Sequence, residues 1–266
     1  MKKLFISADI EGSCDIAVWD ETDKGKADYA AFASQMNREV AAACEGALEA
    51  GIDLVLVRDA HDSARNIDHF SLPSQAQLIR GWAGDPLCMM TGLDESFHAA
   101  VLTGCHDAAG TNSNPLSHTM SLGIIWMALN GETVSESVIN AYSAAFFGVP
   151  VVAVSGDTGL CTRMKALIPN CQTVPVNQGM GGAVKCIHPD LAVQRIREAV
   201  KQACLMNREE CLIKLPDHFR LDVRFREHAR AYRGGFYPGV LRLDSHTLRF
   251  EAGDWYEVLR MMQFCL

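Results

Sequence analysis

The chain has 266 residues, of which 48% are hydrophobic, and a formal net charge of −8 at pH 7. This length and composition are enough for a substantial core in one large domain or two smaller ones, and they exclude a disordered chain. The negative charge and the lack of any Lys/Arg cluster argue against nucleic acid or an anionic membrane as partner. A soluble enzyme or a small-molecule binder fits better. No charged-then-apolar leader and no apolar stretch of membrane-spanning length is present, so we expect a cytoplasmic protein.

Strands and helices alternate along the first part of the chain. The run Leu4-Phe5-Ile6 predicts a buried strand, and residues 27–50 predict a helix because apolar residues recur at helical spacing before Gly51. Further strands are predicted at residues 53–61, 77–79, 99–106 and 149–157. Between them, residues 123–134 indicate a hairpin that turns at Asn130-Gly131, and residues 135–148 a helix capped by Ser135.

The C-terminal part of the chain has a different pattern. A helix is predicted at residues 189–205, a β-rich stretch at 219–250 and a closing helix at 254–264. The whole pattern predicts an α/β fold, with a largely parallel sheet flanked by helices and a smaller C-terminal α+β lobe. We place a soft boundary so that residues 1–184 form the metal-binding catalytic domain and residues 185–266 the smaller lobe.

Two possible motifs are excluded or given an ordinary interpretation. The ten cysteines are scattered and no pair has Cys-x-x-Cys spacing, so we expect most of them to be buried thiols. The glycine-rich residues 179–182 do not form a phosphate-binding loop, because Val184 precedes Lys185 and Cys186 follows it. We interpret this stretch as a flexible turn or a loop near the mouth of the site.

Metal-ligand side chains follow three of the predicted strands. Asp9 and Glu11 follow the first strand, His61 the second and His106 the third, and Glu136 begins the helix after the hairpin. Ligands gather where parallel strands end, and histidine and carboxylate are the usual donors to catalytic zinc. Five such groups suit two ions with a bridging carboxylate better than one tetrahedral ion. A single Asp or His after a strand is more often a turn former or a cap, so spacing alone leaves both interpretations open.

Five stretches together resemble the DppA-like family of D-aminopeptidases, which are cytoplasmic zinc peptidases of the dipeptide-transport operon type. They are "SADIEG", "DAHDS", "GCHDAAGTNSNPLSHTMS", "NGETVSESVINAY" and "VPVVAVSGD", in order along roughly the first two-thirds of the chain. The resemblance implies that two zinc ions bind to Asp9, Glu11, His61, His106 and Glu136. We take Asp9 as the bridge. The resemblance also implies that His118 is catalytic and that the protein is a homodecamer of stacked pentameric rings that admits short peptides.

We therefore expect a zinc-dependent aminopeptidase that cleaves short peptides with a free N-terminal residue, a D-amino acid by resemblance, by attack of metal-activated water. His118 would transfer a proton or donate a hydrogen bond to the oxyanion. Two alternatives remain: a non-catalytic metal-dependent peptide-binding module, and a dinuclear-metal phosphoesterase. The lack of a basic phosphate clamp counts against the second alternative.

Several neighbours of these residues are weaker candidates. Asn140 lies one helical turn beyond Glu136, so it could orient a ligand or contact substrate, although a helix-surface Asn is the simpler interpretation. Asp59 and Asp107 flank the expected ligands and could support the imidazoles. Family members often have Gly-Asp-Asp where this chain has Gly156-Asp157-Thr158. This difference leaves the substrate preference open.

Overall fold

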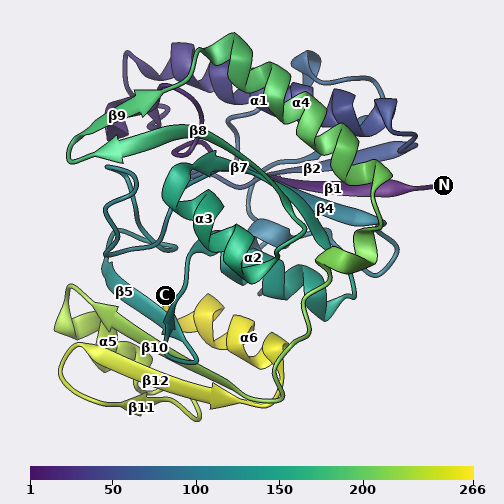
Figure 1. Cartoon of the computed structure of the whole chain (residues 1–266). Helices are drawn as coiled ribbons and strands as arrows, with labels where there is room; N and C mark the ends of the chain where they lie inside the picture. The colour runs from purple at the N-terminus through teal and green to yellow at the C-terminus, as the bar shows by residue number, and fades with distance from the viewer.

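The computed structural model describes residues 1–266 and contains two β-sheets. The larger sheet has seven strands in the order β3-β2-β1-β4-β7-β8-β9, all parallel except β9, which pairs antiparallel with β8 (Figure 1). The strands are β1 Lys3–Ala8, β2 Leu54–Asp59, β3 Ala76–Ile79, β4 Ala99–Cys105, β7 Val151–Asp157, β8 Gln172–Met180 and β9 Ala183–Cys186. The central strands β1, β4 and β7 are mostly apolar and almost completely buried, because helices cover both faces of the sheet.

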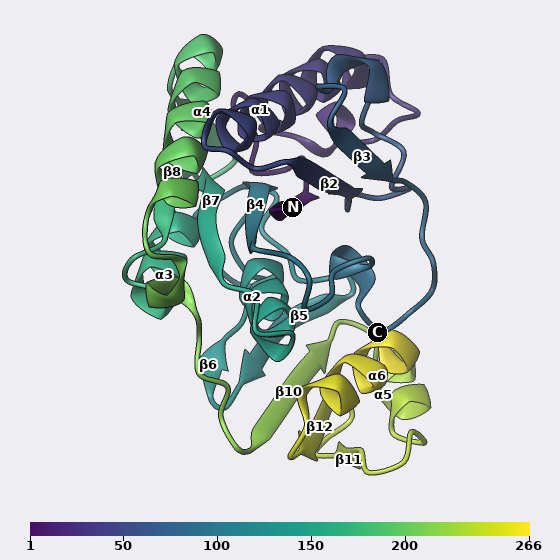
Figure 2. The same cartoon turned by 90° about the vertical axis from the view of Figure 1, so that its right-hand side faces the viewer.

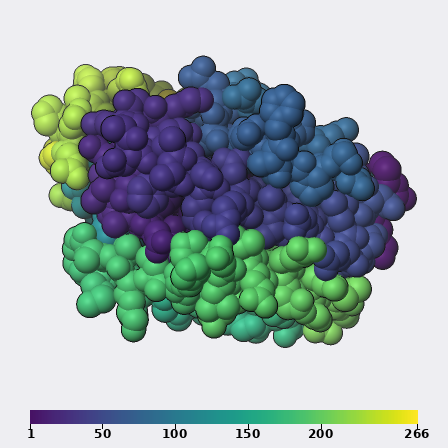
Figure 3. All heavy atoms as spheres, turned by 90° about the horizontal axis from the view of Figure 1, so that it is seen from above, coloured from purple at the N-terminus to yellow at the C-terminus, as the bar shows by residue number.

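Two helices lie side by side on one face of this sheet and two pack on the other. The first pair is α1 (Tyr29–Glu49) and α4 (Pro189–Leu205), which are in contact; the purple and green atoms of these parts of the chain lie side by side in Figure 3. Their backbones approach closely at Gly46, where a Cβ atom would lie 2.2 Å from the Arg197 carbonyl oxygen. The second pair is α2 (Glu136–Phe146) and α3 (Thr158–Leu167), on the opposite side in Figure 1.

The smaller sheet is antiparallel and has the strand order β11-β12-β10-β5-β6 (Figure 2). Its strands are β5 Ile124–Leu129, β6 Glu132–Thr133, β10 Phe219–Phe225, β11 Leu241–Arg242 and β12 Thr247–Ala252, accompanied by α5 (His228–Gly234) and α6 (Trp255–Cys265). The β5–β6 hairpin therefore joins a sheet that otherwise comes from the end of the chain. The division into residues 1–184 and 185–266 stays a prediction, since sheet membership does not by itself define folding units.

The two sheets share one continuous hydrophobic core of 67 buried residues. Four short 3-10 helices complete the chain: η1 Trp19–Glu21, η2 His69–Ser71, η3 Cys88–Met90 and η4 Arg208–Cys211. No helix combines the length and the apolar character that crossing a membrane requires.

The predicted α/β fold class is confirmed, with a mostly parallel sheet, flanking helices and a second sheet. The structure differs from the expectation at residues 179–182, because Gly179 and Met180 are the end of strand β8 and only the next two glycines form the turn. A Cβ atom on Gly179 would lie 2.5 Å from the Ser113 carbonyl oxygen. This glycine therefore marks a close approach of two backbones rather than flexibility.

Candidate metal centre

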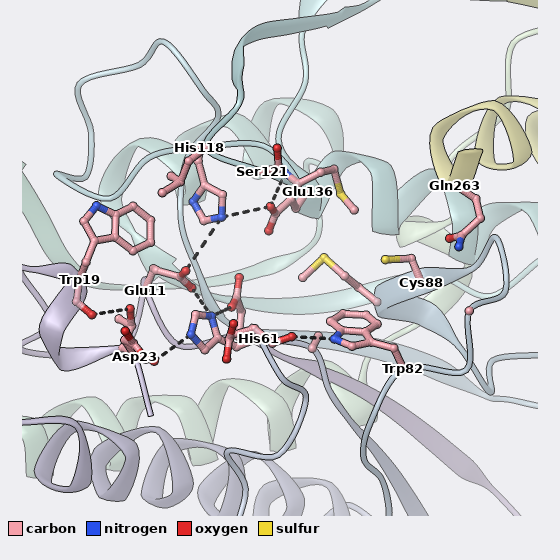
Figure 4. Close-up of a pocket in the computed structure, with 18 of the residues that line it drawn as sticks. Glu11, Trp19, Asp23, His61, Trp82, Cys88, His118, Ser121, Glu136 and Gln263 are labelled. Atoms are coloured by element: carbon pink, nitrogen blue, oxygen red, sulfur yellow. Dashed lines mark hydrogen bonds and ion pairs between the residues drawn. The ribbon is translucent and has the colours of Figure 1, made fainter. Parts of the chain in front are cut away.

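The structure brings all six predicted site residues together at the carboxyl ends of three adjacent parallel strands. Asp9 and Glu11 lie in the loop after β1, His61 after β2 and His106 after β4. Glu136 is the first residue of α2, whose N-cap Ser135 accepts a hydrogen bond from the Val138 amide. His118 lies in the loop between β4 and β5 (Figure 4).

Two groups of candidate ligands share the Asp9 carboxylate, and a third group, Glu11, His106 and His118, links them. In the first group, His61 Nδ1 lies 3.4 Å from Asp9 Oδ1 and 3.1 Å from Glu11 Oε2. In the second group, His106 Nε2 lies 3.5 Å from Asp9 Oδ2 and 3.3 Å from Glu136 Oε2. Each oxygen atom of Asp9 therefore faces a different group, which is the arrangement of a carboxylate that bridges two ions.

The donor spacing and the unpaired atoms both fit zinc. Ligand atoms about 2.1 Å from a tetrahedral ion lie roughly 3.4 Å from one another, close to the separations in both groups. Two of the atoms that face the shared centre, Glu11 Oε2 and His106 Nε2, are buried and have no hydrogen-bond partner. Buried polar atoms without partners are rare in proteins, and a cation between them would satisfy both.

Backbone carbonyl groups orient all three imidazole rings. The carbonyl oxygen of Thr22 lies 3.0 Å from His61 Nε2, that of Asp107 lies 2.9 Å from His106 Nδ1, and that of Leu116 lies 2.9 Å from His118 Nδ1. Each of these ring nitrogens donates its N–H to the carbonyl, because a carbonyl oxygen can only accept. In the neutral imidazole, the other nitrogen of each ring is then the acceptor that faces the carboxylates, as metal-binding histidines require.

The electrostatics of the cluster favour a bound cation. Burial and repulsion by Glu11 raise the pKa of Asp9 well above its ordinary value. Burial by itself disfavours the imidazolium of His61, but the neighbouring Glu11 and Asp9 carboxylates raise its pKa to about 12. The three buried carboxylates thus create a negative potential that attracts protons in the metal-free protein. Divalent cations would neutralise the same charge and leave the histidines neutral.

His118 lies beside both ligand groups and also borders the cavity. Its Nε2 atom is 3.6 Å from Glu136 Oε1 and 3.9 Å from Glu11 Oε1. Its ring stacks on His106 with the ring centroids 4.1 Å apart and contacts the edge of Trp19. Unlike His106, which is fully buried, the His118 side chain retains partial exposure to the cavity. This placement suits a group that exchanges protons with a bound substrate.

Neither of the two flanking aspartates supports an imidazole through its side chain. The Asp59 carboxylate accepts hydrogen bonds from the Asn66 and Ile67 amides, at 2.5 and 2.7 Å, and so shapes the loop after His61. The Asp107 carboxylate pairs with Arg163 at 2.9 Å, and only its backbone carbonyl reaches His106. The interpretation of their side chains as imidazole supports is therefore wrong for both, because each carboxylate bonds to other groups and neither is hydrogen-bonded to a ring.

A cavity of about 660 Å³ opens next to this centre. Trp19 and Trp82 lie on its walls and were missed by the sequence analysis (Figure 4). Also missed were the carbonyl groups that orient the histidines, because every residue has a carbonyl and no residue type signals this role. Asn140 does not line this cavity; it is buried, and its amide donates to the Met89 sulfur at 3.6 Å.

The α/β fold, with histidines and carboxylates gathered at the strand ends beside a cavity, is typical of a metal-dependent enzyme. Comparisons with known proteins narrow this class. The model of the Peptidase_M55 family, described as D-aminopeptidase, matches residues 1–264. The chain therefore belongs to this family of D-aminopeptidases, which are metallopeptidases.

Two matches with individual proteins agree with the family. The chain is 32% identical over 263 residues to a D-aminopeptidase of Bacillus subtilis (strain 168), covering 98% of this chain and 95% of that protein. It also resembles the solved structure of the Zn-dependent D-aminopeptidase DppA from Bacillus subtilis, described as a self-compartmentalizing protease. The TM-score is 0.91 at 31% identity, with 98% of this chain and 95% of that chain covered.

Proposed function

We propose that this D-aminopeptidase holds two zinc ions per subunit and removes a D-amino acid from the free amino end of short peptides. The observation that carries the proposal is the Asp9 carboxylate, whose two oxygen atoms face the histidines of two different groups of ligands. Asp9, Glu11 and His61 would hold one ion, and Asp9, His106 and Glu136 the other. When bound, paired zinc ions polarise a carbonyl group and lower the pKa of water toward neutrality.

We assign proton transfer to His118. Its Nδ1–H is engaged by the Leu116 carbonyl, so Nε2 is the atom that is free to accept or donate a proton. Nε2 lies beside Glu11 and Glu136, and the ring borders the cavity. A histidine placed in this way can take a proton from the attacking water and give it to the leaving amine, or donate a hydrogen bond to the oxyanion.

The charges of the cavity favour a substrate with a free amino group over a phosphoester. Besides the candidate ligands, the cavity wall contains Asp23, Asp62 and Asp85, and neither lysine nor arginine lines it. A protonated α-amino group is attracted by such a wall, whereas a phosphate group needs cationic or N–H donors. This observation supports a peptidase over the dinuclear phosphoesterase.

We also propose that the chain assembles into a homodecamer of stacked pentameric rings and acts in the cytoplasm, as the family resemblance implies. The relative from Bacillus subtilis is described as self-compartmentalizing, which supports an oligomer. In such an assembly the active sites would face an interior that only short peptides enter.

One assay separates the proposed function from its alternatives. Zinc-loaded protein is incubated with D-alanine p-nitroanilide, L-alanine p-nitroanilide and p-nitrophenyl phosphate, with and without a chelator. We expect release of p-nitroaniline from the D-substrate and its loss with chelator. Release from the phosphate ester would instead indicate a phosphoesterase, and hydrolysis of none of the three would indicate a binding module.

A further inference from the structure

A second, smaller cavity adjoins the metal cavity. Its volume is about 170 Å³, and five residues belong to the walls of both cavities: Cys88, Met89, Met120, Ser121 and Gln263. In Figure 4, Cys88 and Gln263 lie on the side of the metal cavity opposite Glu11 and Trp19. A substrate whose scissile bond lies at the ligand groups therefore has a second, adjoining space within reach.

The wall of this second cavity is mostly hydrophobic and contains no charged side chain. Three elements contribute: η3 with the residues before it, α2 through Ile139, and α6 through Leu259 and Met262. Asn140 is the one side-chain amide that belongs to this wall and not to the metal cavity, and it donates a weak hydrogen bond to the Met89 sulfur. Such a wall favours an uncharged guest, because a buried charge without a partner is costly.

The volume of the second cavity sets the size of its guest. An apolar cavity of roughly 150 Å³ in another protein holds a benzene molecule. The cavity of about 170 Å³ can therefore take a side chain as large as that of leucine, methionine or phenylalanine. The cavity is too small to hold a further stretch of peptide backbone, so it fits only a side chain. The methyl group of alanine would leave most of the space unfilled.

We propose that this cavity is the binding subsite for the side chain of the first substrate residue, and that it selects uncharged side chains of the size of leucine, methionine or phenylalanine. This inference rests on the aminopeptidase function proposed above. The first residue is the occupant because it has no preceding chain, so its side chain can enter the small cavity while the rest of the peptide leaves through the larger one. Lysine and glutamate side chains are disfavoured because the wall contains no charged side chain.

Kinetics with dipeptides test the subsite. We expect zinc-loaded protein to cleave D-leucyl-glycine, D-methionyl-glycine and D-phenylalanyl-glycine with a kcat/KM at least about tenfold above that of D-alanyl-glycine, since one methylene in an apolar pocket discriminates by a factor of about 10 to 200. D-lysyl-glycine and D-glutamyl-glycine should be poorer substrates than D-leucyl-glycine. Equal kcat/KM for all of them, or a preference for D-alanyl-glycine, would overturn the proposal.

Variants of Met262 tie the preference to this cavity, because Met262 lines the small cavity and not the metal cavity. Met262→Trp should lower the ratio of kcat/KM for D-leucyl-glycine to kcat/KM for D-alanyl-glycine about tenfold. Met262→Ala should shift the preference toward D-phenylalanine. Phe264→Ala is the matched control on the same helix, because that side chain is 71% exposed. An equal loss for every substrate, or an effect of Met262→Trp only on the second residue (D-alanyl-D-leucine against D-alanyl-glycine), would contradict the subsite.

A binding measurement separates failure of the subsite from failure of the proposed function. If zinc-loaded protein cleaves D-alanyl-glycine without the expected preference, the function stands and the subsite is wrong. If no peptide is cleaved, calorimetry can still test the subsite by comparing the affinities of D-leucinamide and D-alaninamide. The proposal requires tighter binding of D-leucinamide to the unaltered protein and loss of that difference in Met262→Trp. Equal affinities would overturn it.

Discussion

Each histidine of the centre is held by a main-chain carbonyl on one ring nitrogen, which leaves the other nitrogen for the functional contact. His106 shows this clearly, since its Nδ1 contacts the Asp107 carbonyl while Nε2 faces Asp9 and Glu136. A carbonyl cannot be removed by substitution of a side chain. The orientation of the rings is therefore set by the path of the backbone, and replacing a neighbouring side chain should change the site less than moving the loop that contains it.

His118 gives the first prediction at the scale of the residue. His118→Ala should reduce turnover by a factor of about 10² to 10⁴, the usual contribution of a general acid or base. The zinc content should remain two per chain, because the ligand groups stay intact. His218→Ala is a suitable control, since that side chain is 60% exposed. Normal turnover would remove His118 from the mechanism, and loss of zinc would make it a ligand instead.

The raised pKa of His61 predicts how zinc affinity depends on pH. Neighbouring carboxylates raise this pKa to about 12, so the metal-free protein keeps the proton at neutral pH. Zinc binds only the neutral imidazole, so binding must release the proton, and the affinity should increase about tenfold per pH unit for each proton released. Calorimetry in buffers of different ionisation enthalpy counts these protons. Binding without proton release, or affinity that does not change with pH, would contradict the assignment.

At the scale of the element, the position of Asp9 depends on the contact between the ends of β1 and β4. The Asp9 amide donates to the Thr103 carbonyl at 2.9 Å, and the Gly12 amide donates to the Gly104 carbonyl at 2.8 Å. Gly104 has a φ of +65°, and a Cβ atom there would lie 2.0 Å from the Asp9 carbonyl oxygen. Only glycine allows the two strand ends to meet in this way.

Gly104→Ala should therefore weaken both the fold and the metal site. The positive φ and the clash with Asp9 together predict that the free energy of unfolding falls by about 1–3 kcal/mol and that the zinc content is reduced. Gly51→Ala is the matched control, because Gly51 has a φ of +85° but no atom within 4 Å of the added Cβ. Urea unfolding and metal analysis of both variants give the comparison. If the two variants lose equal stability and both keep their zinc, the close approach at Gly104 does not hold Asp9 in place.

The ligand-bearing strands could be predicted because both their apolar pattern and their polar ends are visible in the sequence. Strand β1 and residues Asp9 and Glu11 are an example, and β4 with His106 is another. Helix α3 and strand β8 were not predicted, because polar and apolar residues are mixed in both and neither segment shows a clear helical or strand period. Strand β8 takes its position by pairing with β7. The small cavity could not be predicted either, because α2 and α6 meet there from residues more than a hundred positions apart.

At the scale of the whole molecule, the smaller sheet places α6 beside the cavity that leads to the metal centre. Gln263 of α6 lines both cavities, so the end of the chain contributes to a site built mainly from its first half. In the proposed function, the metal chemistry takes place at the strand ends of the larger sheet, and α6, which packs on the smaller sheet, provides part of the wall that contacts the substrate.

The proposed homodecamer predicts the mass of the particle in solution. Ten chains of 29.1 kDa give about 290 kDa. Light scattering coupled to size-exclusion chromatography should give this mass for the zinc-loaded protein. A particle of one or two chains would contradict the assembly while leaving the metal centre untouched.

The central claim is that two ions bind at the shared Asp9 carboxylate, and anomalous diffraction at the zinc edge tests it most directly. Crystals of zinc-loaded protein should show two peaks per chain, one within bonding distance of Glu11 and His61 and the other of His106 and Glu136, with Asp9 contacting both. Crystals of Asp9→Asn should lose at least one peak. A single peak, or none at these residues in fully loaded protein, would contradict the account.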